Sequence, residues 1–240
     1  MRITPLRGVI ERRLFVIYRL DPNVARDVLP ALLRPRLIGG YAVAGIALAH
    51  LGRLRPAGLP PVAGLSREST THGIAVEGRS VRSPHTGVFV VHRDSAGAGG
   101  GRPLGRSPRF TVDERTDGLR VSYTSQGRVV RVDVDVSLAT ALEGSALFPD
   151  VRAAARFLEV DGVGGAPWAP QLRGLKLAAG DGCVSAARVR TATSSIFADS
   201  SMFPPGSLHL DAALLLRDLA QAPVPAERVR AARRPAPHLA

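Results

Sequence analysis

The chain has 240 residues, enough for one large domain or two small ones with a substantial core. Its hydrophobic fraction of 45% excludes a disordered chain, and no apolar run approaches the length of a transmembrane helix. The net charge of +12 comes almost wholly from arginines spread along the chain, with few aromatic residues between them, which argues against a nucleic-acid surface.

Compartment and metal chemistry are constrained by a few residues. The first twenty residues lack the apolar segment and cleavage site of a signal peptide, so we expect a cytoplasmic protein. The single Cys183 excludes an internal disulfide framework and a cysteine-rich zinc site. The histidines have no metal-ligand spacing, and we expect neither a metal nor a cofactor.

The N-terminal part predicts a strand, a helix and a second strand. Asp21 suits the N-cap of the helix and Pro22 its first position, while Pro30 should end or kink it. Val24, Val28 and Leu32 would form its buried stripe. The expected elements are a strand at 14–20, a helix at 21–33, a strand at 41–54 and a loop at 55–65.

From residue 68 onward the pattern is mostly that of antiparallel strands. Valines from Val130 to Val136 alternate with Arg131, Asp133 and Asp135, which predicts a strand with one apolar and one solvated face. The expected elements are strands at 68–78, 86–94, 109–115, 119–125 and 128–138, with turns at 79–85, 116–118 and 126–127.

The C-terminal part predicts a helix at 148–160 and a hairpin at 176–197 that turns at 180–182. Residues 207–220 fit either a strand or a helix, and the Pro, Ala and Arg-rich tail at 222–240 should fray. We therefore expect one α+β domain over residues 1–221, mainly antiparallel β with a few short helices.

The glycine-rich stretch at 97–110 raises the question of a phosphate site. It lacks the lysine of a P-loop, and Pro103 and Pro108 remove backbone N–H groups that a phosphate cradle would use. No helical pattern follows it, as a dinucleotide-binding fingerprint would require. A flexible loop and the wall of a cavity both remain open.

Glu68, Thr70 and His72 alternate along an expected strand, so all three should face one side. That side is either the lining of a cavity or a polar, solvent-facing surface. His50 is expected to be capped or exposed. The sequence contains no G-x-S-x-G motif, so we do not expect an α/β-hydrolase.

Several stretches, in order, resemble the acetoacetate decarboxylase superfamily, and in part its uncharacterised bacterial YqjF-like branch. The resemblance covers about residues 10–220, and order and spacing carry it more than any single motif. The stretches are "VIYRLDPNVARDVLPALLRPRLIGGYAVAGIAL", "GVFVVHRDSAGAGGGRPLGRSPRF", "LFPDVRAAARFLEVDGVGGAPW" and "LRGLKLAAGDGCVSAARVRTATSSIFAD".

The resemblance implies a cone-like or barrel-like antiparallel fold with a central cavity. In the family, a lysine in a Gly-Arg-x…Pro-Lys loop forms a Schiff base with a keto acid. Here Gly101 and Arg102 match the start of that loop and Pro108 its proline, but Arg109 stands in place of the lysine. Arginine stays protonated and cannot form the imine.

The resemblance also places the family's buried glutamate at Glu68 and its N-terminal arginine at Arg12 or Arg13. The expected catalytic residues are Glu68, His72 and Arg109, and the expected substrate-binding residues are Arg12, Thr70 and Arg102.

These groups suit a lyase, isomerase or cyclase that acts on a carbonyl or oxo-acid compound through an enol. A non-catalytic ligand-binding module on the same fold is the alternative, and a basic nucleic-acid-associated protein is the third reading. We expect the protein to bind a small-molecule ligand and to bind neither nucleic acid nor a membrane. The sequence leaves open whether the chain forms a homo-oligomer.

Borohydride reduction in the presence of acetoacetate or pyruvate should give no covalent adduct, because Arg109 replaces the imine-forming lysine. Intact-mass spectrometry measures this directly. A stoichiometric adduct, above all on Lys176, would contradict the prediction and restore Schiff-base chemistry.

Overall fold

The computed structural model describes residues 6–56, 65–79, 84–97, 109–125, 129–158 and 183–219. Two short helices and a large set of strands make up these ranges. In chain order they are β1 Leu6–Leu20, α1 Pro22–Val28, β2 Arg34–Pro35, β3 Leu37–Ile38, β4 Tyr41–Pro56, β5 Leu65–Arg79, β6 Pro84–Gly97, β7 Arg109–Arg115, β8 Gly118–Thr124, β9 Arg131–Ala139, α2 Val151–Leu158, β10 Cys183–Ser194 and β11 Leu208–Leu219.

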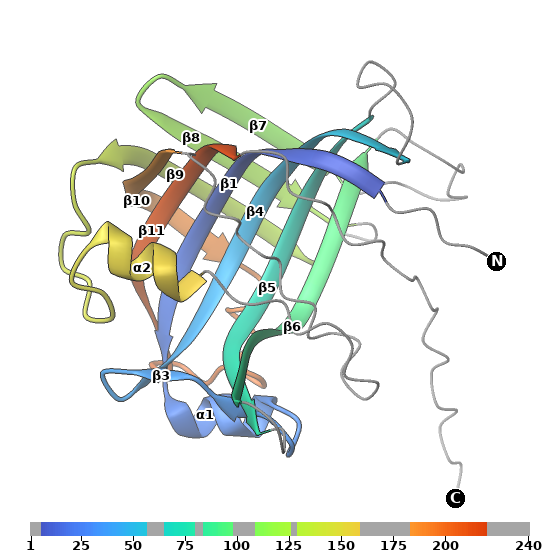
Figure 1. Cartoon of the computed structure of the whole chain (residues 1–240). Coiled ribbons are helices and arrows are strands. Elements are labelled where there is room, and N and C mark those ends of the chain that lie inside the picture. The colour runs from blue at the N-terminus through green and yellow to red at the C-terminus, as the bar shows by residue number, and fades with distance from the viewer. Residues whose placement is uncertain are drawn as a thin grey trace, which may run out of the picture.

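All the strands listed above belong to one antiparallel sheet that curls into a half-barrel (Figure 1). Its order is β2-β5-β4-β1-β11-β10-β9-β8-β7, with β3 added beside β4 and β6 beside β5. β1, the first strand, lies in the middle and pairs with β4 on one side and β11 on the other. The expected fold class, mainly antiparallel β with short helices, is therefore confirmed.

The sheet buries apolar side chains on both faces, which is why its central strands lack a solvated side. Leu14, Val16 and Tyr18 of β1 point into the half-barrel and join the larger core cluster, here called the inner core. Ile17 and the partly buried Phe15 point the other way and join the smaller cluster, the outer core, which α2 covers (Figure 1). Alternation along β1 thus divides the molecule into two layers.

Helix α1 is shorter than expected. Asp21 caps it by accepting a hydrogen bond from the Asn23 N–H at 2.7 Å, and Pro22 occupies the first turn. It ends at Val28, because Leu29 precedes Pro30 and takes the extended conformation that proline imposes on its predecessor. The expected stripe is wrong at Leu32, which is 73% exposed beyond the end of the helix.

Most expected strands are found within a few residues of their predicted ends. Residues 207–220, left between strand and helix, form strand β11, and the alternating valines of β9 are buried as predicted. Helix α2 spans Val151–Leu158, within the expected 148–160. The turns at 126–127 and 180–182, most of the glycine-rich stretch and the 222–240 tail lie outside the described residues.

No helix in the described part of the chain combines the length and apolar character needed to cross a bilayer.

Candidate functional site: two arginines on opposite faces of one strand

Arg12 and Arg13 are neighbours on β1 and are both buried, at 7% and 2% exposure. Because successive side chains of a strand point to opposite faces, they enter different surroundings. Arg12 lines a polar hollow together with acidic side chains, and Arg13 lines an apolar cavity on the outer face. The sequence left open whether Arg12 or Arg13 matches the family's N-terminal arginine. The two side chains can bind different kinds of group, because one lies among acids and the other among apolar residues.

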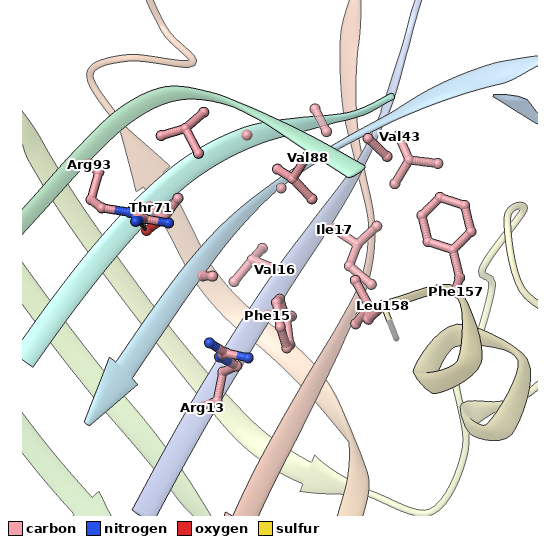
Figure 2. A pocket seen from close by; sticks show the side chains of 16 residues that line it. Arg13, Phe15, Val16, Ile17, Val43, Thr71, Val88, Arg93, Phe157 and Leu158 are labelled. Atoms are coloured by element: carbon pink, nitrogen blue, oxygen red, sulfur yellow. Dashed lines mark hydrogen bonds between the residues drawn. The ribbon is translucent and has the colours of Figure 1, made fainter. Parts of the chain in front are cut away.

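The apolar cavity has a volume of about 100 Å³ and lies on the outer face, beside α2. Its floor is made of small residues from β4 and β5: Gly45, Ala47, Gly73 and Ala75. Figure 2 shows Arg13, Thr71 and Arg93 toward one end and Phe157 and Leu158 of α2 toward the other. A ligand in this space would meet charge at one end and hydrocarbon at the other.

The hollow exists because two glycines face each other across β4 and β5. Gly45 and Gly73 are direct Cα partners in the sheet, so neither strand supplies a side chain at this point. A Cβ on Gly73 would lie 2.4 Å from Cγ1 of Val88, and one on Gly45 would lie 3.1 Å from the Val16 carbonyl oxygen. Side chains at these positions would strain the sheet as well as reduce the cavity.

Arg13 is a buried cation, and no described side chain supplies its counter-charge. Among the described residues it forms no ion pair and no hydrogen bond, and its Nε is buried without a partner. Its guanidinium carbon lies 5.3 Å from the centroid of the Phe15 ring. Burial, with a smaller contribution from the Arg93 charge, lowers the pKa of Arg13 to about 10, so the group stays charged at neutral pH.

The polar hollow, of about 400 Å³, is lined by Val112 and six charged or titratable residues: Glu11, Arg12, His50, Glu68, Glu114 and Arg217. Four of them occupy one row across the sheet, because Arg217, Arg12, His50 and Glu68 are successive Cα partners on β11, β1, β4 and β5. Strand register therefore places two arginines, a histidine and an acid side by side.

Arg12 is the centre of this row. Its Nη2 donates to both Glu68 carboxylate oxygens, at 3.0 and 3.2 Å, and its Nη1 donates to Glu114 at 3.1 Å. Glu114 belongs to β7, the last strand of the sheet, and also lies 3.4 Å from Nε of Arg217. The arginines of β1 and β11 thus tie the end strand β7 to the middle of the sheet.

His50 connects two of the carboxylates. Its Nδ1 lies 2.7 Å from Glu68 Oε1 and its Nε2 lies 3.3 Å from Glu11 Oε2. The sequence favoured a capped or exposed role for His50, whereas it lies half-buried between two acids. An imidazole with a carboxylate at each nitrogen can pass a proton between them.

His72 lies deeper on the same face, away from the polar hollow. It is fully buried; its Nε2 hydrogen-bonds Ser194 Oγ at 2.9 Å, and its ring meets Phe197 edge-on. Burial, and to a smaller degree the nearby His92, lowers the pKa of His72 to about 3. The ring is neutral and packed into the inner core.

The structure brings together only part of the predicted set. Glu68 and Arg12 form an ion pair, and Thr70 and His72 share the face of Glu68 as expected from the alternation. Thr70 is fully buried, and its Oγ1 has no hydrogen-bond partner among the described residues.

Arg109 is exposed at the first position of β7, five residues from Glu114 and hence about 17 Å along the strand. The counter-ion of Glu68 in the structure is Arg12, and the catalytic role expected of Arg109 stays a prediction. Arg102 lies outside the described residues.

The hollow on the other face of the same strands is not among the sequence predictions. Small residues occupy alternate positions on two adjacent strands, namely Gly45 and Ala47 on β4 and Gly73 and Ala75 on β5. This alternation, like that of Glu68, Thr70 and His72, can be seen in the sequence, and it indicates a hollow.

In the described part of the chain, no group of three or more His, Cys, Asp or Glu side chains is arranged to hold a metal ion.

Arg12→Met should lower the free energy of unfolding by about 3 kcal/mol, because it leaves the half-buried Glu68 without its guanidinium. Glu114→Gln should cost under about 1 kcal/mol, since that carboxylate is half exposed. Urea unfolding of both variants provides the measurement. An Arg12→Met protein as stable as the wild type would contradict the central role of Arg12.

His72 should make the fold sensitive to acid. The pKa of His72 is about 3 in the folded chain and 6.5 in an unfolded chain. Between these values His72 is protonated in the unfolded chain and neutral in the folded chain, so acid favours unfolding. At pH 5 this linkage should remove about 2 kcal/mol of stability. His72→Gln should lose correspondingly less between pH 7 and pH 5 in urea titrations; an unchanged pH dependence would refute the assignment.

Comparison with known proteins gives matches of the overall fold only. No protein-family model and no curated protein matches the chain. The acetoacetate decarboxylase of Legionella pneumophila is 10% identical with a TM-score of 0.43, over 91% of this chain and 88% of that one. An acetoacetate decarboxylase-like enzyme from Sphingomonas wittichii is 13% identical with a TM-score of 0.46, over 90% and 89%.

The enduracididine biosynthesis enzyme MppR, solved with pyruvate, is 13% identical with a TM-score of 0.48, over 90% of this chain and 88% of that one. The first two structures are named as an acetoacetate decarboxylase and a related enzyme, and membership of that superfamily or of its YqjF-like branch stays a prediction for this chain. The chain is thus similar in overall fold to acetoacetate decarboxylase-like structures.

Proposed function

We propose that this chain binds a small organic acid, an oxo acid or a related carbonyl compound, in the apolar cavity, with Arg13 as the group that holds its carboxylate. The observation that carries the proposal is the buried guanidinium of Arg13, which has no partner in the described part of the chain and lies at the polar end of an otherwise apolar space.

The charge of Arg13 is buried and is not compensated by any side chain that the structure describes. A buried cation without a counter-ion destabilises the folded state, and replacing such a group with a hydrophobic side chain is often stabilising. The arrangement is favourable only when an anion enters, because the pair then forms where water competes little. A carboxylate matches the guanidinium by two parallel hydrogen bonds.

The lining indicates which acid would fit. Besides Arg13, its described polar side chains are Thr71 and Arg93, joined by a hydrogen bond of 3.2 Å from Arg93 Nε to the Thr71 hydroxyl. Neither is acidic, so a second oxygen on the ligand, such as an oxo group, would meet only a hydroxyl or a cation there. The rest of the lining is hydrocarbon and would accept a short apolar tail.

The polar hollow supports a second candidate, proton transfer at carbon next to a carbonyl. Glu68 is held by Arg12 and lies 2.7 Å from His50, which supplies an acid, a base and a fixed cation for an enolate oxygen. Exchange of the pyruvate methyl protons in heavy water, followed by NMR, distinguishes the two. Exchange that Glu68→Gln abolishes and Arg13→Met preserves would favour this second candidate.

Pyruvate or α-ketobutyrate should bind the wild-type chain in isothermal titration calorimetry, and Arg13→Met should weaken binding by about a hundredfold through loss of a charged bidentate contact. Without ligand, Arg13→Met should be at least as stable as the wild type, unlike Arg12→Met on the neighbouring position.

Arg131→Met provides the matched control, because Arg131 is an exposed arginine of β9 and does not line the cavity. It should leave both the affinity and the stability unchanged. Equal affinity of the wild type and Arg13→Met would rule out the proposed role of Arg13.

A further inference from the structure

The last turn of α2 closes one end of the apolar cavity. Phe157 and Leu158 line it there, away from the end at which Arg13 and Thr71 lie (Figure 2). Phe157 is 6% exposed and packs in the outer core, with its ring centroid 5.4 Å from that of Phe148. An aromatic ring on a short helix therefore forms the apolar end wall.

Arg36 fixes this wall in place. Its guanidinium carbon lies 4.1 Å from the centroid of the Phe157 ring, and its Nη1 donates to the Phe157 carbonyl oxygen at 3.5 Å. Its own backbone N–H donates to the carbonyl of Ala75, a floor residue of the cavity, at 2.9 Å. The end wall and the floor are thereby joined through one residue that does not itself line the cavity.

We infer that Phe157 determines the length of apolar tail that the cavity accepts, and that Arg36 acts as its positioning residue. This inference rests on the proposed function, because it needs a ligand whose carboxylate is anchored at Arg13. β1 runs from Arg13 to Ile17 along the cavity, a distance of about 13 Å. A tail that starts at Arg13 and grows along β1 ends against the ring.

The two residues have separable effects. Shortening the Phe157 side chain removes the wall and opens space for additional methylene groups, each of which gains free energy by leaving water. Removing the Arg36 guanidinium leaves the ring present but without its stacked cation and without the hydrogen bond to the helix end. Both changes should therefore favour longer tails, the first more strongly.

The test measures dissociation constants for pyruvate, α-ketobutyrate, α-ketocaproate and α-ketocaprylate by titration calorimetry. The wild type should favour the short acids. Phe157→Ala should raise the affinity for α-ketocaproate relative to α-ketobutyrate by about tenfold. Phe157→Leu, a milder change that preserves folding, should move the ratio in the same direction by a smaller factor.

Arg36→Ala should also move the ratio toward long acids, and Arg36→Lys, which keeps a cation near the ring, should restore part of the wild-type preference. Phe203→Leu is the matched control, because Phe203 is an equally buried phenylalanine of the inner core. It should lower stability without changing the ratio.

The outcomes separate the two proposals. If no acid binds the wild type, or binding ignores Arg13→Met, the proposed function fails and takes this inference with it. If binding depends on Arg13 but the ratio is the same in both Phe157 variants, only the inference is overturned. A ratio that shifts in the Phe157 variants and not in Arg36→Ala would overturn the positioning role of Arg36.

Discussion

The alternation of side chains along β1 is the constraint on which the rest of the molecule depends. β1 lies in the middle of the sheet, between β4 and β11, and the sheet is buried on both faces. The side chains of β1 therefore pack alternately into the inner core and the outer core. Two consecutive arginines at such a place send one guanidinium into each interior. The inner one becomes the centre of an ion-pair row, and the outer one faces hydrocarbon.

The two guanidiniums differ in what the fold supplies to them. Sheet register gives Arg12 its partners, because His50 and Glu68 follow it on the adjacent strands and Glu114 reaches it from β7. No described strand gives Arg13 an acid; its neighbours across the sheet are alanine and leucine. The first arrangement links the end strand β7 to the middle of the sheet. In the second, the guanidinium is buried at a cost in free energy that no described acid offsets.

Much of the architecture could be predicted from residue patterns because the strands alternate strongly. The valines of β9 and the shared face of Glu68, Thr70 and His72 follow directly from a period of two. Such a period shows which residues share a face and cannot show what lies opposite that face. The pairing of Glu68 with Arg12 depends on sheet order, because β1 and β5 both flank β4.

The apolar cavity also depends on strand pairing, which the residue pattern of a single strand does not show. Gly45 and Gly73 are separated by a long stretch of chain, and only the register between β4 and β5 makes them partners. The last turn of α2 closes one end of the hollow they leave, and Phe157, which forms this end wall, is buried on the same helix face as Ala154. Because the guanidinium of Arg36 binds the end of that helix and its backbone binds the floor, end wall and floor are coupled. Sheet register thus opens the apolar cavity, and the last turn of α2 closes one end of it. Arg36, from another part of the chain, supports the position of that turn.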